Sequence, residues 1–265
     1  MSEAGVAAAR ALVDDVNALL DRLTPADWAA DSACHGWRVH DVVTHLGFFF
    51  NFIADPNLVL PENPSGTSER LNDAAVRERA DWSSQQAIGY YREQSVAGLA
   101  ALEALQGAEM RDVPLTMLDL GTFRMGQLAD AVAFDHLVHL SCDLIAPFGP
   151  VSPTEVSLSA AIDPAIDWMI AGLPQMNGAA VARALTRPIG LRLTGATERS
   201  FVLSRDTDSS SLLVTETDAV PDDLAVTSAT DFLRWATTRS AWRSAVTLTG
   251  DHPLIAWALD EIDIV

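Results

Sequence analysis

Hydrophobic positions at helical spacing dominate the first part of the chain. From residue 3 to residue 23 the apolar side chains fall on one broad stripe, which predicts an amphipathic helix. The pair Thr24-Pro25 ends this helix. A second helix is predicted at residues 36–54. Its inward-facing positions are Val39, Val42, Val43, Leu46 and Phe50.

Two more helices are predicted before residue 150. Residues 68–105 have the pattern of one very long helix, with a break expected near Gly89, and residues 123–146 have the pattern of a fourth. The segment PNLVLPENPSGTS, between the second and third helices, is a loop long enough to cover a site. Four helices with short or loop connections predict a bundle, and bundles hold metal sites between facing helices.

The pattern becomes mixed from about residue 151. SLSAAIDPAIDWMIAGLPQM and GAAVARALT are helical, whereas IGLRLTG, SFVLSR, SLLVTE and DLAVTS are short runs typical of strands. SATDFLRWAT returns to helix with Ser228 or Thr230 as N-cap, AVTLTGD is a last strand, and HPLIAWALDEI is a closing helix. The predicted fold class is therefore α+β: a four-helix bundle at 1–150 and a smaller α+β domain with a mainly antiparallel sheet at 151–265.

Composition narrows the class of protein. The 265 residues are 49% hydrophobic, as in a globular chain, and the apolar runs are too short to cross a bilayer. The net charge of −19 argues against nucleic acid as a partner. The N-terminus lacks the features of a signal peptide, and two cysteines are too few for a disulfide framework. We therefore expect a cytoplasmic protein without a membrane partner, either a monomer or a homodimer.

Three residues from two predicted helices suggest metal chemistry. Asp135 and His139 are four residues apart and project from the same helical face, and His45 ends the amphipathic run WRVHDVVTHL. Two histidines and a carboxylate would give a divalent metal three protein ligands and leave one position open for water or a thiol, which is typical of catalytic sites. The alternative is a pair of core histidines hydrogen-bonded to Asp135 without any metal.

Neighbouring residues have competing interpretations. Asp143 is either an acceptor that fixes the tautomer of His139 or a surface residue at the end of its helix. For Cys142, burial as a small hydrophobic residue is favoured over a place in the site. Cys34 is expected to be structural rather than nucleophilic, because no basic group is evidently placed to activate it.

The remaining candidates are three histidines and one tryptophan. His136 points about 100° away from His139 around the helix, so we expect it to be exposed or packed and not a ligand. His35 and His40 fall before or away from the face of His45. Trp37 is expected to anchor the start of the second helix in the core.

The chain also resembles a known family. SACHGWRVHDVVTHL and AFDHLVHLSCDL are similar to the two signatures of the mycothiol-dependent maleylpyruvate isomerase family, a branch of the DinB-like metalloproteins. DLAVTSATDFLRWATTRS and AVTLTGDHPLIAWAL resemble the sterol-carrier-like domain that follows the bundle in many members. The resemblance covers almost the whole chain, and it implies a DinB-like metal-binding bundle at 1–150 and a sterol-carrier-like domain at 151–265.

The resemblance also implies cofactors and roles. His45, Asp135 and His139 would ligate zinc or another divalent metal, and mycothiol, the low-molecular-weight thiol of actinobacteria, would be the cosubstrate. The isomerase has Glu where this chain has Asp135, which is one methylene shorter. Arg239 resembles an arginine that family members direct from the C-terminal domain toward the bundle, where it could hold a carboxylate; the alternative is a surface ion pair.

The function implied is that of a metal- and mycothiol-dependent isomerase or thiol transferase. A metal-activated thiolate would attack a small electrophilic substrate, and isomerisation, transfer and hydrolysis all stay open. The alternative class is a non-catalytic or regulatory module that keeps the fold and binds a small ligand or a partner.

Overall fold

The computed structural model describes residues 3–264. The chain divides into two compact units, Met1–Ala165 and Ile166–Val265, and helix α7 (Leu158–Met176) runs across the division. Within the described residues, no helix has the length and apolar character needed to span a membrane.

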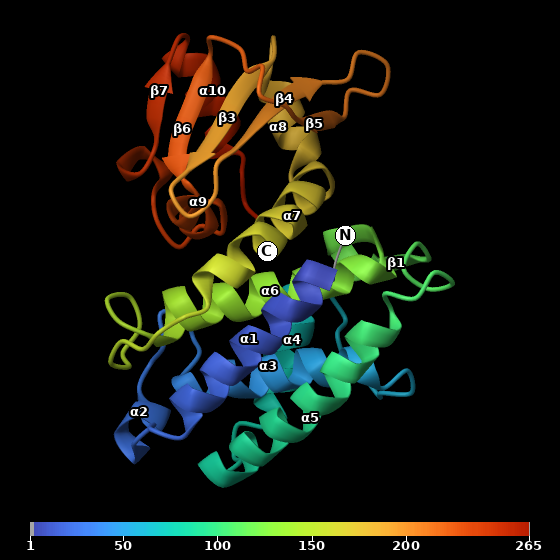
Figure 1. Ribbon diagram of the computed structural model, residues 1–265, viewed down its shortest axis with the longest axis vertical. Helices are drawn as coiled ribbons and strands as arrows, with labels where there is room; N and C mark the ends of the chain where they lie inside the picture. Colours follow the sequence, from blue (N-terminus) through green and yellow to red (C-terminus); the bar gives the residue numbers. More distant parts are fainter. Residues whose placement is uncertain (1–2, 265) are drawn as a thin grey trace. The chain divides into compact units, whose positions relative to one another are not determined.

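The first unit is a helical bundle. Helix α3 packs along α5, and α1 packs against both α5 and α6 (Figure 1). The short helices α2 and α4 contact α3. The bounds are α1 Glu3–Leu20, α2 Pro25–Ala29, α3 Val39–Ala54, α4 Ser68–Arg77, α5 Ser84–Ala104 and α6 Leu128–Val138. This arrangement confirms the predicted four-helix bundle.

Two glycines allow α3 and α5 to approach closely. A Cβ atom at Gly98 of α5 would lie 2.2 Å from Cδ1 of Phe50, and one at Gly47 of α3 would lie 2.8 Å from the ring of Tyr90. Any larger residue at Gly98 would force the buried Phe50 ring, which is 0% exposed, to move. The pairing of α3 with α5 therefore depends on small residues on both helices.

The long helix predicted at 68–105 is interrupted elsewhere than expected. The chain leaves helical geometry at residues 78–83, whereas Gly89 lies inside α5 with open space where a Cβ would stand. Ser83 begins α5 with a capping box: its Oγ accepts the N–H of Gln86, and the side chain of Gln86 accepts the N–H of Ser83. The break follows from this cap and not from glycine.

The helix predicted at 123–146 is wrong at both ends. Its first residues belong to a two-stranded antiparallel hairpin, and its last turn is wider than an α-helix. The hairpin places Leu115 opposite Phe123, whose side chain is buried. The elements are β1 Pro114–Met117, η1 Leu118–Leu120, β2 Gly121–Arg124, η2 Met125–Gln127, α6, and the π-helix η3 His139–Leu144.

The second unit contains a five-stranded sheet with the order β5-β4-β3-β6-β7. Only β3 and β6 pair in parallel, so the sheet is mainly antiparallel, as predicted. Ser228 is the N-cap of α9 and accepts the N–H of Asp231 at 3.0 Å. The elements are α8 Gly178–Ala184, β3 Ile189–Thr194, β4 Arg199–Arg205, β5 Leu212–Glu216, β6 Leu224–Ser228, α9 Ala229–Ala236, η4 Trp242–Ser244, β7 Thr247–Thr249 and α10 His252–Asp260.

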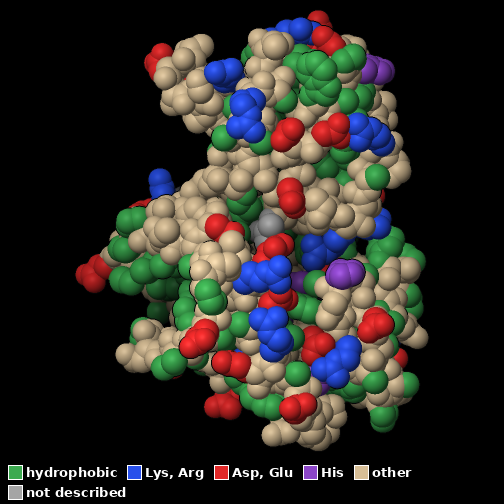
Figure 2. Space-filling view, turned by 180° about the vertical axis from the view of Figure 1, so that it is seen from behind, with side chains coloured by type: hydrophobic (Ala, Val, Ile, Leu, Met, Phe, Trp, Pro, Cys, Tyr) green, Lys and Arg blue, Asp and Glu red, His purple; other side chains and the backbone are tan. Residues whose placement is uncertain are grey.

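The negative net charge is not gathered into one patch on the face shown in Figure 2. Acidic and arginine side chains lie interspersed there. Over the described residues as a whole, several arginines are paired with carboxylates; Arg187, for example, bridges Asp223 and Asp251 at 2.7 and 2.9 Å. Exposed pairs of this kind contribute little to stability, on the order of 0–1 kcal/mol each.

The start of α3 is fixed by a buried carboxylate. Asp41 Oδ2 accepts the backbone N–H of Arg38 at 2.9 Å, and the Arg38 guanidinium binds both oxygens of the same carboxylate. Burial raises the pKa of Asp41, but hydrogen bonds from His40 and Arg38 outweigh burial and hold this pKa below its ordinary value. The charged form of Asp41 therefore stabilises the helix that carries His45.

We predict that Asp41→Asn lowers the free energy of unfolding by about 1–3 kcal/mol at neutral pH, the usual contribution of hydrogen bonds to a charged group. Because the pKa of Asp41 is lower in the folded state, its contribution is complete above 3.8, the ordinary value, and is lost as pH falls below it. Urea unfolding of both proteins checks this: the difference should be large near neutral pH and shrink in acid. An undiminished difference in acid would contradict the assignment.

Candidate metal centre

Three of the predicted site residues meet inside the first unit. His45 comes from the middle of α3, Asp135 from α6 and His139 from the first position of η3. His45 Nε2 lies 3.0 Å from Asp135 Oδ1, and His139 Nε2 lies 3.6 Å from the same oxygen. One ligand atom from each residue lies within 4.8 Å of the other two.

The donor set fits a divalent metal. Zinc bonds to nitrogen and oxygen are about 2.0–2.1 Å, so tetrahedral ligand atoms are separated by about 3.3 Å, between the two distances observed here. Asp135 Oδ2 and His45 Nδ1 are buried and have no hydrogen-bond partner among the described residues. A buried carboxylate oxygen without a partner is costly, and a cation at this carboxylate would remove much of that cost.

The three imidazoles around Asp135 control its ionisation. Burial raises the pKa of Asp135, but His45, and less strongly His139 and His136, outweigh burial and keep this pKa below its ordinary value. The carboxyl group is therefore ionised at neutral pH, as a metal ligand must be. The Asp135 side chain as a whole is 15% exposed, although its Oδ2 is buried.

Asp143 orients His139. Asp143 Oδ2 lies 2.7 Å from His139 Nδ1, and Asp143 is 0% exposed. The alternative of a surface aspartate is therefore wrong. A proton held on Nδ1 by this carboxylate leaves Nε2 with its lone pair toward Asp135, which is the usual arrangement behind a metal-bound histidine. Asp135, His139 and Asp143 follow one another at intervals of four residues. His139 and Asp143 lie in the π-helix η3, a form often found at functional sites.

Trp37 forms one wall of the site. Its ring stacks on His139 with centroids 6.1 Å apart and lies 5.0 Å from the ring of His45. Its Nε1 donates to Asp73 Oδ1 at 3.1 Å, which ties the wall to α4. Trp37 is partly exposed, so the expected role as a core anchor is wrong: this ring covers the two histidines.

A cavity opens beside Trp37. Its volume is ≈ 380 Å³. The lining is mixed polar and apolar: His35, Gly36, Trp37, Arg38, Asp41, Asp73, Val76, Arg77 and Ala80. Trp37 is thus shared by the cavity and by the histidine pair.

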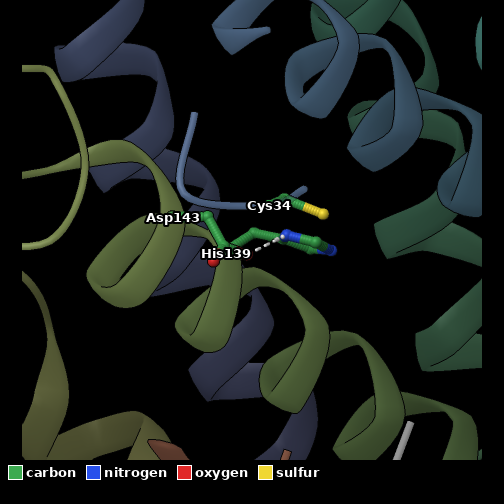
Figure 3. A group of neighbouring side chains, drawn as sticks. All are labelled: Cys34, His139 and Asp143. Carbon is green, nitrogen blue, oxygen red and sulfur yellow. Dashed lines mark hydrogen bonds and ion pairs between the residues drawn. The ribbon is translucent and has the colours of Figure 1, made fainter. Parts of the chain in front are cut away.

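The two cysteines differ in their surroundings. Cys142 is buried, 4% exposed, as expected for a small hydrophobic residue. Cys34 is partly exposed and lies with His139 and Asp143 in a second close group (Figure 3). Sequence reasoning missed this proximity, because Cys34 and His139 are far apart in the chain and the residues around each of them give no sign of the contact.

The other histidines do not join the three. His136 is fully buried, packs 4.9 Å from the ring of Phe50, and contacts the carbonyl of Val132 at 3.1 Å. Burial lowers the pKa of His136 to about 4, so this ring is neutral at physiological pH. His40 is buried against Asp41, and His35 is exposed. His136 is thus packed, as expected, and all three rings lie outside the group formed by His45, Asp135 and His139.

Arg239 belongs to the second unit. It follows α9 and is partly buried, and its backbone N–H donates to the carbonyl of Arg234 at 2.9 Å. Its role toward a substrate carboxylate stays a prediction.

With this geometry in place, comparison with known proteins identifies the family. The family model described as "Mycothiol maleylpyruvate isomerase N-terminal domain" matches residues 9–141, half of the chain. The chain belongs to the mycothiol maleylpyruvate isomerase family. The matched region contains His45, Asp135 and His139, and thus the whole candidate metal centre.

Solved structures of this family share the fold. Two crystal structures of the mycothiol-dependent maleylpyruvate isomerase, one of them a histidine-to-alanine mutant, each give a TM-score of 0.57. The mutant is 12% identical and the other 13% identical to this chain; each alignment covers 93% of this chain and 92% of the other. The likeness therefore extends over both units. Among curated proteins, none matches the chain significantly.

Asp143→Asn tests the support of His139. An amide still accepts a hydrogen bond but carries no charge, so the basicity of the ring falls. We predict that affinity for zinc falls about 10–100-fold, the usual loss for such a partner. Competition with a chromophoric chelator measures it. Asp14→Asn, at an exposed position on α1, is the matched control and should leave the affinity unchanged. Equal affinities in both variants would contradict the role given to Asp143.

Proposed function

We propose that this protein is a metal- and mycothiol-dependent isomerase or thiol transferase acting on a small electrophilic substrate. The observation that carries the proposal is the meeting of His45, Asp135 and His139 around one small volume, with Asp143 behind His139. The family and the likeness to structures of the mycothiol-dependent maleylpyruvate isomerase support the choice of thiol and reaction.

His45 and His139 would hold the metal, zinc or another divalent ion, together with Asp135. Three protein ligands leave a coordination position open. When bound there, the metal would lower the pKa of a thiol and so supply a thiolate near neutral pH. Addition of that thiolate to an activated double bond permits rotation about the bond, and its loss then returns the isomerised product. Retention of the thiol on the substrate instead gives transfer.

The protein's own groups orient and shield this chemistry. Asp143 holds the proton on His139 Nδ1 and keeps Nε2 available. Trp37 lies over both imidazoles and restricts access of water to them. Asp135 needs no base to become a ligand, because its pKa lies below the ordinary value and its carboxyl group is already ionised.

The cavity beside Trp37 suits the polar part of a thiol cosubstrate. Its volume, ≈ 380 Å³, is within the range of small-molecule sites, about 300–1,000 Å³. Arg77 is exposed at its edge, and Asp73 and His35 offer further hydrogen-bonding groups. A polyhydroxylated ligand could bind there while its thiol lies near the histidines.

Metal content tests the ligand set. Protein purified without chelator should contain about one equivalent of divalent metal, zinc above all. His45→Ala and His139→Ala should remove it, and Asp135→Ala should weaken binding strongly, because two ligands hold a divalent ion poorly. His252→Ala, an exposed histidine of the second unit, should keep full content. Elemental analysis measures the metal content of each protein. Full metal content in all three ligand variants would refute the assignment of these residues as ligands.

Binding of mycothiol tests the reaction class. We expect calorimetric titration to give binding to the metal-loaded protein, and none to the metal-free protein or to His139→Ala, because the thiolate needs the open coordination position. Binding that is independent of metal, or no binding at all, would favour a non-catalytic ligand-binding module.

A further inference from the structure

A second group of potential metal ligands lies against the first. Cys34 Sγ, one ring nitrogen of His139 and one carboxylate oxygen of Asp143 all lie within 4.8 Å of one another. In Figure 3 the Cys34 side chain extends alongside the imidazole of His139, and Asp143 meets the same ring from the helix. The group is largely enclosed: Asp143 is 0% exposed, His139 is 8% exposed and Cys34 is partly exposed.

The backbone holds Cys34 at this place. The N–H of Ala33 donates to the backbone carbonyl of Asp143 at 3.0 Å, which ties the Cys34 loop directly to η3. Ser32 Oγ accepts the N–H of Cys34 at 3.1 Å and donates to the carbonyl of Trp37 at 2.7 Å. Gly36 turns the loop with φ +83°, a conformation that L residues with side chains rarely adopt. The thiol therefore approaches His139 through a loop fixed at both ends.

We propose that Cys34, His139 and Asp143 form a second metal-binding set, selective for thiophilic ions. A cysteine thiolate is a soft ligand and favours ions such as cadmium or Cu(I), whereas the His45/Asp135/His139 set has only nitrogen and oxygen donors. Binding releases the proton of the thiol to solvent, and the proton on His139 Nδ1 moves to Nε2, so the imidazole stays neutral while Nδ1 becomes free to bind the ion. Thiolate and carboxylate then carry two negative charges, which a divalent cation neutralises in this enclosed place.

The two sets share His139 and therefore compete. Asp143 serves the first set by holding the proton on Nδ1, whereas in the second set it is itself a ligand. An ion bound in the second set takes Asp143 as a ligand, so Asp143 no longer holds the proton on Nδ1. The same ion also binds the ring of His139. A thiophilic ion at Cys34 thus displaces the metal of the first set, and the choice between the sets depends on the softness of the ion.

Cobalt(II) spectroscopy of the full chain tests the second set. A thiolate ligand gives an intense near-ultraviolet charge-transfer absorption that imidazole and carboxylate ligands lack. His45→Ala breaks the first set and leaves the second intact, so this variant should show the band at saturating cobalt. Adding Cys34→Ser should abolish it, and adding Cys142→Ser, the matched cysteine control, should retain it. In the otherwise unchanged chain, Cys34→Ser should reduce the preference for cadmium over zinc at least about tenfold.

The first set is tested separately through the zinc content of Cys34→Ser, in which the second set is broken. This variant should bind zinc and should lose it when His45→Ala is added, so the two proposals can fail independently. No charge-transfer band in His45→Ala at saturating cobalt would overturn the second set. A band that persists after Cys34→Ser would overturn it too, because another thiolate would be the ligand. Circular dichroism of each variant verifies that it is folded before the cobalt titration.

Discussion

The negative charge of an ionised carboxylate inside a helical bundle must be compensated by nearby groups. Around Asp135 these groups are imidazoles from α3, α6 and η3. Burial alone would raise its pKa, yet the imidazoles of His45, His139 and His136 more than offset burial. This compensation requires α3 and α6 to face each other with His45 level with Asp135. The close pairing of α3 with α5 at Gly98 then contributes to the site, because it fixes the helix from which His45 projects.

The row Asp135, His139, Asp143 gives one histidine two carboxylate neighbours. His139 Nε2 lies 3.6 Å from Asp135 and Nδ1 lies 2.7 Å from Asp143, so each ring nitrogen has a fixed direction. The change from α6 to the π-helix η3 falls at His139 itself. Asp135 Oδ1 also lies 3.0 Å from His45 Nε2.

The surroundings of the histidines combine polar and soft groups. Trp37 covers both rings, Asp73 anchors Trp37, and Cys34 approaches from a loop tied to Asp143. The site proposed to bind a thiol cosubstrate thus has a cysteine thiol of the protein beside it. Under the proposal of two donor sets, both sets share the imidazole of His139. Binding of a thiophilic metal to the second set would then change metal binding at the first, whatever reaction the first set supports.

Local sequence patterns were enough to predict the elements with strong periodicity: the stripes of α1 and α3, the alternating strands of the second unit and the Ser228 cap. It also indicated which face carries Asp135 and His139, because four-residue spacing fixes direction on a helix. Only the tertiary structure decided the hairpin before α6, the burial of Asp143, and the approach of Trp37 and Cys34 to the histidines. The approach of Trp37 and Cys34 to the histidines depends on contacts between residues distant in the chain, which local propensity does not encode. The hairpin is local, but its strands of four residues each are too short to show a clear alternating pattern.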